Sequence, residues 1–595
     1  MEYTRTYSIR KGEYFADALK RAGKEFIPTN CIINKLLPGL GATHCELIAP
    51  RKSIIIEPNV PVIESKAKKH KNALAVYKGV TVRKIIDFLE DNHDRHYKLL
   101  TTPEGFAKIK EAMQTVGIDI YEECFILFDE CEKLVQDVHY RDSIREPMND
   151  FFLFQNKALI SATPIIPEKD NRFDGFARVL IQPDYAYRQK LKLITTNNVL
   201  ETLQEVIEAK RGTVCIFCNS IDSIDSFYRL IPELSNACTF CSEDGQYKLW
   251  KGNRRKKSMM ITELERYNFF TSRFYSAVDI ISPNPPHVIF ISDLFGATQS
   301  VIDPATEAIQ IRGGVNSVTH IASIRPDLEC MSSTEIDDWI RGASTVYNNW
   351  KFQLARTSNI GERTLLQEAI GENSYLPYLD DKGKPDPFLI ANFYEKEQVK
   401  RLYTSTDLLC DAYRQTDYFV FSHEERLMPV SDNERMAIQH RLAKKKRTEL
   451  IVRKLEEMEK MSRTTDKKLQ KRYQRMLGNL ITSTADRYIY DCFCCFGADF
   501  IRQSDYNENK LRTALNASSE HTIKKSAQMR ISIQRTFPIG SELSVQEAKS
   551  MLKQVYKKMG LNTGRGITTK ELEQYAEIEN NRNRTERTIK ILKFK

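Results

Sequence analysis

The segment from Lys35 to Thr43, Lys-Leu-Leu-Pro-Gly-Leu-Gly-Ala-Thr, has the residues of a phosphate-binding loop except for one. Gly39 and Gly41 would let backbone N–H groups close around phosphate oxygens, and the Thr43 hydroxyl would bind Mg²⁺. In such loops a lysine that reaches the outer phosphates precedes the threonine, but this chain has Ala42 there. The pattern predicts a nucleotide site without its usual cation. The alternative is a tight strand-to-helix turn.

An acidic pair follows an apolar run further along the chain. Asp129 and Glu130 come directly after residues 124–128, and Ser161-Ala-Thr-Pro164 follows a second apolar run about 30 residues later. In open α/β sheets ligands bind at the carboxyl ends of the strands. One carboxylate of such a pair assists Mg²⁺, and the next can orient an attacking water. Each signal alone is weak, since such acids often lie in solvated loops, but their order and spacing together indicate phosphoryl-transfer chemistry.

The strands and helices expected around these residues follow a repeating pattern. Residues 30–165 alternate short apolar strands with amphipathic helices, which is typical of a buried parallel sheet. The expected elements are a helix over 82–91 and strands over 31–33, 53–56, 97–101, 124–128 and 158–160. The alternation returns from about 190 to 325, most clearly in the strands 213–218 and 287–292. The sequence therefore predicts an α/β fold with two tandem parallel-sheet domains.

Beyond about residue 335 the strand pattern gives way to charged helical sequence. The last part, residues 537–595, reads as a helix over 543–558, a short helix from Thr568 and a strand over 588–592, which suits a winged-helix module. The predicted domains are 1–185, 186–330, a helical basic region over 331–520 and the possible winged-helix module over 521–595.

Over residues 25–325 the chain resembles superfamily 2 helicases of the DEAD/DEAH-like kind. Gly39 to Thr43 corresponds to motif I, Asp129-Glu-Cys-Glu132 to motif II and Ser161-Ala-Thr163 to motif III. The resemblance implies two tandem RecA-like domains that bind ATP and Mg²⁺. It further implies cofactor binding by Gly39, Gly41, Ala42 and Thr43, Mg²⁺ binding by Thr43 and Asp129, and catalytic roles for Asp129, Glu130 and Gln310.

Fainter segments extend the resemblance. Residues 54–59 look like motif Ia, 216–220 like motif IV, 271–279 like motif V with Ala277 in place of glycine, and 308–314 like motif VI. Nucleic-acid contacts are implied for Thr102, Pro103 and Thr163. Motif VI has Gly314 where the family has arginine. Losing this cation as well as the loop lysine predicts feeble or absent hydrolysis, unless Lys35, Arg51 or Lys52 supplies a displaced charge.

The net charge of +10 fits a polyanionic partner, DNA or RNA. The run Lys444, Lys445, Lys446 and Arg447 is the expected contact with phosphates. The alternative is a solvated helical face, or a coil in which Glu456, Glu457 and Glu459 pair locally with the cations.

Cys215-x-x-Cys218 and Cys238-x-x-Cys241 have the spacing of a four-cysteine zinc site. Both pairs lie in apolar strand-like sequence, where alternate side chains point to opposite faces. We therefore expect buried free thiols and no structural zinc. The charged first 24 residues and the lack of any apolar run of about 18 residues predict a cytoplasmic protein without a membrane partner.

Two functions remain open at this point. One is an ATP-dependent nucleic-acid motor in replication, repair or recombination. The other is a helicase fold that has lost catalysis and serves as a non-enzymatic nucleic-acid-binding or scaffold protein, for example in a viral assembly. In either case the C-terminal helical region is a candidate surface for a protein partner.

Overall fold

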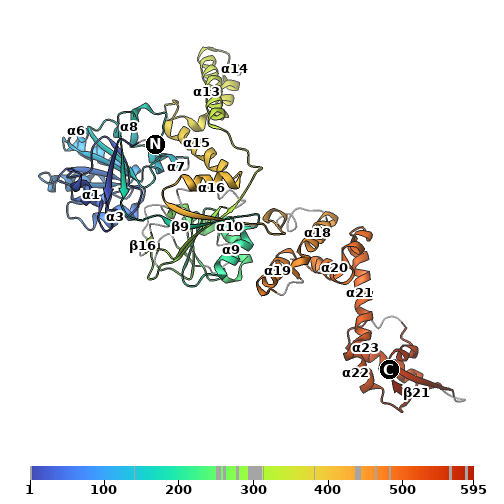
Figure 1. Ribbon diagram of the computed structural model, residues 1–595. Helices are drawn as coiled ribbons and strands as arrows, with labels where there is room; N and C mark the ends of the chain where they lie inside the picture. The colour runs from blue at the N-terminus through green and yellow to red at the C-terminus, as the bar shows by residue number, and fades with distance from the viewer. Residues whose placement is uncertain are drawn as a thin grey trace. The chain divides into compact units, whose positions relative to one another are not determined.

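The computed structural model divides into two compact units, an N-terminal unit of residues 1–428 and a C-terminal unit of residues 429–595 (Figure 1). It describes residues 3–139, 141–249, 256–258, 261, 263–275, 280–292, 311–312, 314–380, 382–435, 444–462, 466–481, 484–561, 566–582 and 587–595. Of the predicted motifs V and VI, residues 276–279, 308–310 and 313, which include Ala277, Asp279 and Gln310, lie outside the described residues.

The first sheet of the N-terminal unit has eight strands in the order β1-β8-β2-β7-β6-β3-β5-β4, all paired in parallel. Helices cover both faces, so the strands are apolar on both sides: Ile32 packs in one core and Ile33 in the other. The strands are β1 (Arg5–Ile9), β2 (Cys31–Asn34), β3 (Ser53–Ile56), β4 (Ala73–Val76), β5 (Lys98–Thr101), β6 (Phe125–Asp129), β7 (Asn156–Ser161) and β8 (Ala177–Pro183). The main helices are α1 (Phe15–Arg21), α2 (Ala42–Ile48), α3 (Val60–Ala67), α4 (Val82–Asp91), α5 (Phe106–Thr115) and α7 (Lys133–Gln136).

The second sheet also has eight parallel strands, in the order β12-β11-β13-β10-β15-β17-β9-β18. Its strands are β9 (Gln189–Thr196), β10 (Val214–Cys218), β11 (Cys238–Phe240), β12 (Lys256–Ser258), β13 (Tyr267–Phe270), β15 (His287–Ser292), β17 (Ser317–Ser323) and β18 (Phe419–Arg426). The helices α9 (Val199–Glu208) and α10 (Ile221–Leu230) belong to this part of the chain. Strand β18 arrives from nearly 100 residues beyond β17 and forms the edge beside β9.

In the described residues between β17 and β18 lie the 3₁₀ helix η6 (Leu376–Tyr378) and four α-helices: α13 (Ser333–Arg356), α14 (Ile360–Gly371), α15 (Pro387–Leu402) and α16 (Thr406–Gln415). Helices α13 and α14 pack against each other as a hairpin (Figure 1). Helix α15 packs on α7 of the first sheet domain, where Asn392 Nδ2 donates to the Val135 carbonyl at 2.7 Å. Arg145 also pairs with Asp386 at the start of α15, at 2.5 Å. This helical segment therefore ties the second half of the unit to the first sheet.

The C-terminal unit begins with the helices α18 (Lys444–Ser462), α19 (Lys467–Leu480), α20 (Thr484–Gln503) and α21 (Glu508–Lys525). A small module follows, made of α22 (Ala527–Thr536), β19 (Glu542–Ser544), α23 (Val545–Lys558), the 3₁₀ helix η7 (Thr569–Gln574), β20 (Ala576–Arg582) and β21 (Arg587–Phe594). Its three strands form an antiparallel sheet in the order β19-β21-β20. Helix α23 starts two residues later than predicted because Leu543 belongs to β19 and Ser544 caps the helix.

The predicted fold class is confirmed: two tandem RecA-like parallel-sheet domains are followed by a mostly helical C-terminal region. In the described part of the chain, no helix is long and apolar enough to span a membrane.

Candidate nucleotide site

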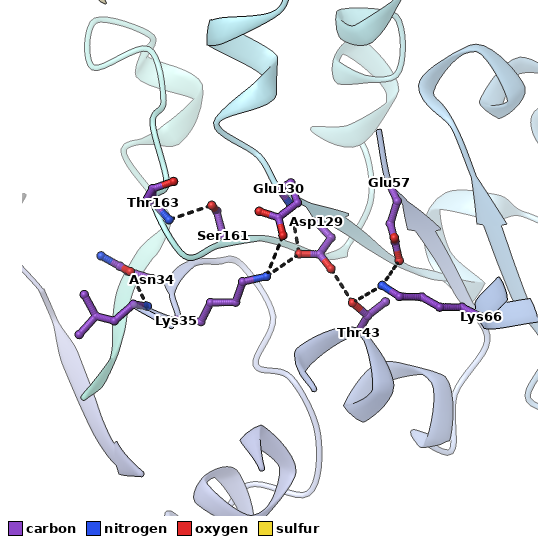
Figure 2. Close-up of polar contacts among 10 residues, drawn as sticks. Asn34, Lys35, Thr43, Glu57, Lys66, Asp129, Glu130, Ser161 and Thr163 are labelled. Carbon is purple, nitrogen blue, oxygen red and sulfur yellow. Dashed lines mark hydrogen bonds and ion pairs between the residues drawn. The ribbon is translucent and has the colours of Figure 1, made fainter. Parts of the chain in front are cut away.

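Three neighbouring strands bring the three strongest motifs to one edge of the first sheet. Strands β2, β7 and β6 lie side by side in parallel, so their carboxyl ends meet there. Lys35 follows β2 and donates its backbone N–H to the carbonyl of Ser161, the last residue of β7, at 2.8 Å. Asp129 ends β6 beside Ile160. The loop, the acidic pair and the Ser-Ala-Thr segment therefore form one site (Figure 2).

The loop between β2 and α2 has an unusual backbone. Leu36, Gly39 and Gly41 have positive φ values of 53°, 74° and 77°. Left-handed residues in such turns direct successive N–H groups into concavities that bind anions. A positive φ is uncommon for a non-glycine residue, yet Glu130 also has a positive φ, of 53°. Backbone strain of this kind clusters at functional sites, because the surrounding structure must stabilise it.

The Thr43 hydroxyl and the Asp129 carboxylate are in direct contact. Thr43 Oγ1 donates to Asp129 Oδ2 at 2.5 Å (Figure 2). Both side chains are buried, with 7% and 3% exposed. A hydroxyl beside a carboxylate is the oxygen pair that a Mg²⁺–nucleotide site needs, so these residues fit the ion expected here.

An ammonium reaches the acidic pair from Lys35, ahead of the glycines. Its Nζ lies 3.2 Å from Asp129 Oδ1 and 3.2 Å from Glu130 Oε1 (Figure 2). Burial alone would lower the pKa of Lys35, but the charges of Asp129 and Glu130 outweigh it and raise that pKa above its ordinary value. For Asp129, burial acts to raise the pKa and the charge of Lys35 acts to lower it. The net result is a pKa below the ordinary value of an aspartate. The site therefore holds a charged ammonium in front of the acidic pair.

The other two candidate cations are engaged elsewhere. Arg51 pairs with Glu46 at 2.5 Å and lies 3.4 Å from the centre of the Phe125 ring. Lys52 pairs with Glu123 at 2.7 Å. Of the three cations named from the sequence, Lys35 is the one that contacts the acidic pair.

A second ammonium comes from a residue that no sequence motif indicates. Lys66 of α3 donates to Thr43 Oγ1 at 2.9 Å and to Glu57 Oε1 at 2.7 Å (Figure 2). Burial raises the pKa of Glu57, against the opposing charge of Lys66. Glu57 belongs to the predicted motif Ia, directly after β3, and its side chain faces the nucleotide site (Figure 2). A lysine on a short surface helix has no sequence signal that distinguishes it.

Four carboxylates surround these two ammoniums. Glu132 is the fourth after Glu57, Asp129 and Glu130, and burial together with the Glu130 charge raises the pKa of Glu132 to about 8. Among the described residues no three His, Cys, Asp or Glu side chains could form a metal cage. Mg²⁺ at Thr43 and Asp129 would therefore take its remaining ligands from phosphates and water.

Ala42 begins α2 and does not face these charges. Its side chain is 4% exposed and belongs to the apolar core that includes Ile33 and Ile160. The position that normally carries the lysine is a core position in this chain.

The residues expected to contact nucleic acid lie along the same edge but are buried. Thr102 follows β5 with 2% exposed, and Pro103 begins the 3₁₀ helix η1 (Pro103–Gly105). Thr163 is 5% exposed, and its N–H donates to Ser161 Oγ at 2.9 Å. Their side chains are therefore not freely accessible in this conformation.

The second sheet approaches the loop. Leu36 and Leu37 pack in the same apolar core as Leu193 and Phe419 of β9 and β18. The Tyr418 hydroxyl donates to the Ala162 carbonyl, between the two ends of motif III, at 2.7 Å. These contacts place the glycine loop and motif III against the second domain.

The faint motifs IV and V meet at the carboxyl ends of β10 and β13. Asn219 Oδ1 accepts a hydrogen bond from the Ser272 backbone N–H at 3.2 Å. Gln310, predicted to be catalytic, lies outside the described residues.

Two of the four cations in the predicted basic run pair with acids of their own unit. Lys445 pairs with Asp505 at 2.6 Å, and Arg447 pairs with the buried Asp486 at 2.7 Å. Lys446 is exposed, and Lys444 begins α18. The predicted alternative of local pairing is therefore present in part: the run itself pairs with aspartates, and Glu457 pairs with Lys454 further along α18 at 2.7 Å.

The four cysteines with zinc-like spacing are buried thiols that form no disulfide. The second sheet domain has two apolar cores, and the two thiols of each pair lie in different cores. Cys215 and Cys238 lie in one core, and Cys218 and Cys241 lie in the other. The strand alternation predicted for these pairs is therefore what the structure has.

The sequence matches no family model and no curated protein. Among solved structures, S. cerevisiae Dbp5 bound to RNA and ADP BeF3 is similar with a TM-score of 0.33 and 12% identity, over 50% of this chain and 80% of that chain. A DEAD box protein from Methanococcus jannaschii is similar with a TM-score of 0.29 and 13% identity, over 49% of this chain and 82% of that chain. The ATP-dependent Type ISP restriction-modification enzyme LlaBIII bound to DNA is similar with a TM-score of 0.34 and 11% identity, over 90% of this chain and 39% of that chain. At these TM-scores and identities the similarity carries no argument about this chain.

Proposed function

We propose that the N-terminal unit is a superfamily 2 helicase-like motor that binds and hydrolyses ATP with a displaced phosphate-binding lysine. The observation that carries the proposal is the position of Lys35, whose Nζ lies 3.2 Å from both acids of motif II. A cation aimed at the charge of the transition state commonly contributes several kcal/mol in phosphoryl-transfer sites. The chain would thus retain this contribution without a lysine at position 42.

Each residue of the site has a role in this proposal. Gly39 and Gly41 present backbone N–H groups to the phosphates, and Lys35 contacts the outer phosphates. Thr43 and Asp129 hold Mg²⁺, which neutralises phosphate charge when bound. Glu130 orients the attacking water, and Gln310 would come from the second domain. The motor would act on DNA or RNA in replication, repair or recombination.

The test compares Lys35→Ala with Lys52→Ala in the full chain. Lys52 is a matched control because it is a lysine in an ion pair on the same domain, with Glu123. We expect Lys35→Ala to lower ATP turnover by about 10²–10³-fold, the usual cost of losing one group that stabilises the transition state. Lys52→Ala should change it little. Turnover is measured with and without DNA and RNA, and Glu130→Gln should remove turnover while ATP binding persists.

Equal turnover in Lys35→Ala and wild type would refute the role of Lys35. Turnover that responds to neither DNA nor RNA would refute the motor while leaving the nucleotide site intact.

One observation favours the second function, a retired helicase fold that acts as a nucleic-acid-binding or scaffold protein. The Thr43 hydroxyl, which Mg²⁺ would need, already contacts both Asp129 and Lys66. If Lys66 blocks the metal, wild type should bind no ATP, and Lys66→Ala should create Mg²⁺-dependent ATP binding. Binding by wild type that Lys66→Ala leaves unchanged would exclude this block.

A further inference from the structure

The charge of this chain is divided unequally between its two units. Residues 1–428 contain 54 Lys and Arg against 59 Asp and Glu, a net charge of −5. Residues 429–595 contain 35 against 20, a net charge of +15. Within them, residues 524–595 contain sixteen basic and seven acidic side chains. A basic half joined to an acidic half indicates a polyanion-binding surface in the basic half.

Many cations of the C-terminal unit already have partners. Lys445, Arg447 and Lys454 pair with aspartates and glutamates of their own helical region. In the small module Lys524 pairs with Glu571 at 3.1 Å, and Lys590 of β21 stands opposite Glu542 of β19 and Glu579 of β20. The pairs around Lys590 therefore give the middle of the antiparallel sheet mixed charge, whereas a continuous basic surface lies on another element of the module.

Helix α23 provides that surface. Ala548, Leu552, Val555 and Tyr556 point into the core of the module. Lys549, Lys553 and Lys557 are exposed and recur every fourth residue, so they line one stripe with about 6 Å between successive positions along the axis. No ion pair is recorded for these three lysines within the described residues. Their charges face solvent and are available to a ligand.

We propose that this lysine stripe of α23 is a binding site for the phosphate backbone of duplex nucleic acid, separate from the nucleotide site. Positive side chains in a row on a rigid helix match the repeating charge of such a backbone. The site goes beyond the proposed ATP hydrolysis and does not depend on it.

The aromatic residues of the module argue for a duplex over a single strand. Phe537, Tyr556 and Tyr575 are buried and Phe594 is half-buried. Binding to single strands relies on exposed rings that stack on the bases, and the described residues of this module present none that are exposed. The lysines would contact phosphates and would make no contacts with the bases.

The element after α23 supports binding without sequence preference. In a helix-turn-helix the second helix enters the major groove and reads base edges. Here that place in the chain is taken by η7, a 3₁₀ helix of six residues. Its Glu571 is held by Lys524 and Tyr556. Affinity for a duplex should therefore depend on salt and hardly on base sequence.

The test measures binding of the full chain, without nucleotide, to labelled random-sequence duplexes of DNA and of RNA across a salt series. The variant is the triple Lys549→Gln, Lys553→Gln and Lys557→Gln. Each phosphate contact contributes about 0.9 to the slope of log affinity against log salt. We expect the triple variant to lose about 2 to 3 from the slope and roughly tenfold or more in affinity at low salt. The two duplexes show whether the ligand is DNA, RNA or either.

Two further variants make the result specific. The triple Lys11→Gln, Lys20→Gln and Lys24→Gln removes three exposed lysines from the N-terminal unit and should leave the slope unchanged. The triple Lys→Arg variant at positions 549, 553 and 557 keeps the charge and should retain affinity. An unchanged slope in the glutamine triple would overturn the proposal and leave the stripe to an acidic protein surface. An equal loss in the N-terminal control would also overturn it. Because no ATP is present, neither result depends on hydrolysis at Lys35.

Discussion

Ala42 occupies the apolar core, and the charged side chain of a lysine at this position would have to leave that core. Ala42 is 4% exposed among the side chains of the first sheet, while the ammonium of Lys35 already stands before Asp129. We expect Ala42→Lys to lower the free energy of unfolding by about 1–3 kcal/mol, as overpacked cores do, without raising ATP affinity. Urea unfolding and ATP titration measure the two effects. If Ala42→Lys instead restored ATP binding to Lys35→Ala, position 42 would face the phosphates.

Glu132 predicts a pH dependence of stability. Burial and the Glu130 charge raise its pKa from about 4.5 to about 8, so the folded protein keeps a proton that the unfolded chain releases. At a pH between these two pKa values, unfolding releases the proton of Glu132. The free energy of unfolding therefore falls as the pH rises through this range. Glu132→Gln cannot titrate, so its stability relative to wild type should increase from about pH 5 to about pH 8. Urea unfolding at both pH values tests this, with the exposed Glu122→Gln as control. A constant difference would contradict it.

At this scale the sequence located the glycines, the threonine and the acidic pair, because their residue types and order are characteristic of phosphate chemistry. Lys35 could be named as one of three cations but not chosen, since the choice depends on where each side chain points in the fold. Lys66 could not be found, because its contact with Thr43 joins two helices whose packing no local pattern records.

Gly105 fixes the turn that follows β5. A Cβ atom on this residue would lie 2.5 Å from Thr101 Oγ1 and 2.7 Å from the Val76 carbonyl oxygen, closer than atoms approach without displacement. We expect Gly105→Ala to cost about 1–3 kcal/mol of unfolding free energy and to disturb the Thr102-Pro103 segment. Gly175→Ala is the matched control, since nothing lies within 4 Å of its added Cβ. Equal unfolding midpoints for the two variants would show that the turn can relax.

The elements were predictable where the hydrophobic period was strong. Helix α4 begins and ends at the predicted residues, and β3 and β15 match as well. Strand β18 was missed because its sequence, Phe-Val-Phe-Ser-His-Glu-Glu-Arg, is polar in its second half. It is the edge strand of its sheet and pairs on one side with β9, so its charges reach solvent. A strand completed by a partner more than 200 residues away leaves little local signal.

Across the N-terminal unit, the two sheets meet through contacts that join distant parts of the chain. Tyr418 precedes the edge strand of the second sheet, and its hydroxyl donates to the Ala162 carbonyl of motif III at 2.7 Å. Leu36 and Leu37 of the glycine loop pack in the same core. Any movement of the second sheet relative to the first must change these contacts, which lie directly beside the nucleotide site. The coupling between the two halves is therefore open to a test at one hydroxyl group.

Tyr418→Phe removes that hydroxyl and keeps the ring. The Ala162 carbonyl then loses its donor in a buried place, which typically costs about 1–3 kcal/mol. We expect a lower midpoint of urea unfolding and, if the site is active, altered ATP turnover, because Ala162 lies between Ser161 and Thr163 at the edge that holds Lys35. Tyr187→Phe is the control: its ring packs against the same core, and no hydrogen bond of its hydroxyl is recorded among the described residues. If both variants unfold at the same midpoint as wild type, the hydrogen bond between the sheets contributes nothing to the unit, and the apolar contacts of Leu36 and Leu37 alone must couple the site to the second domain.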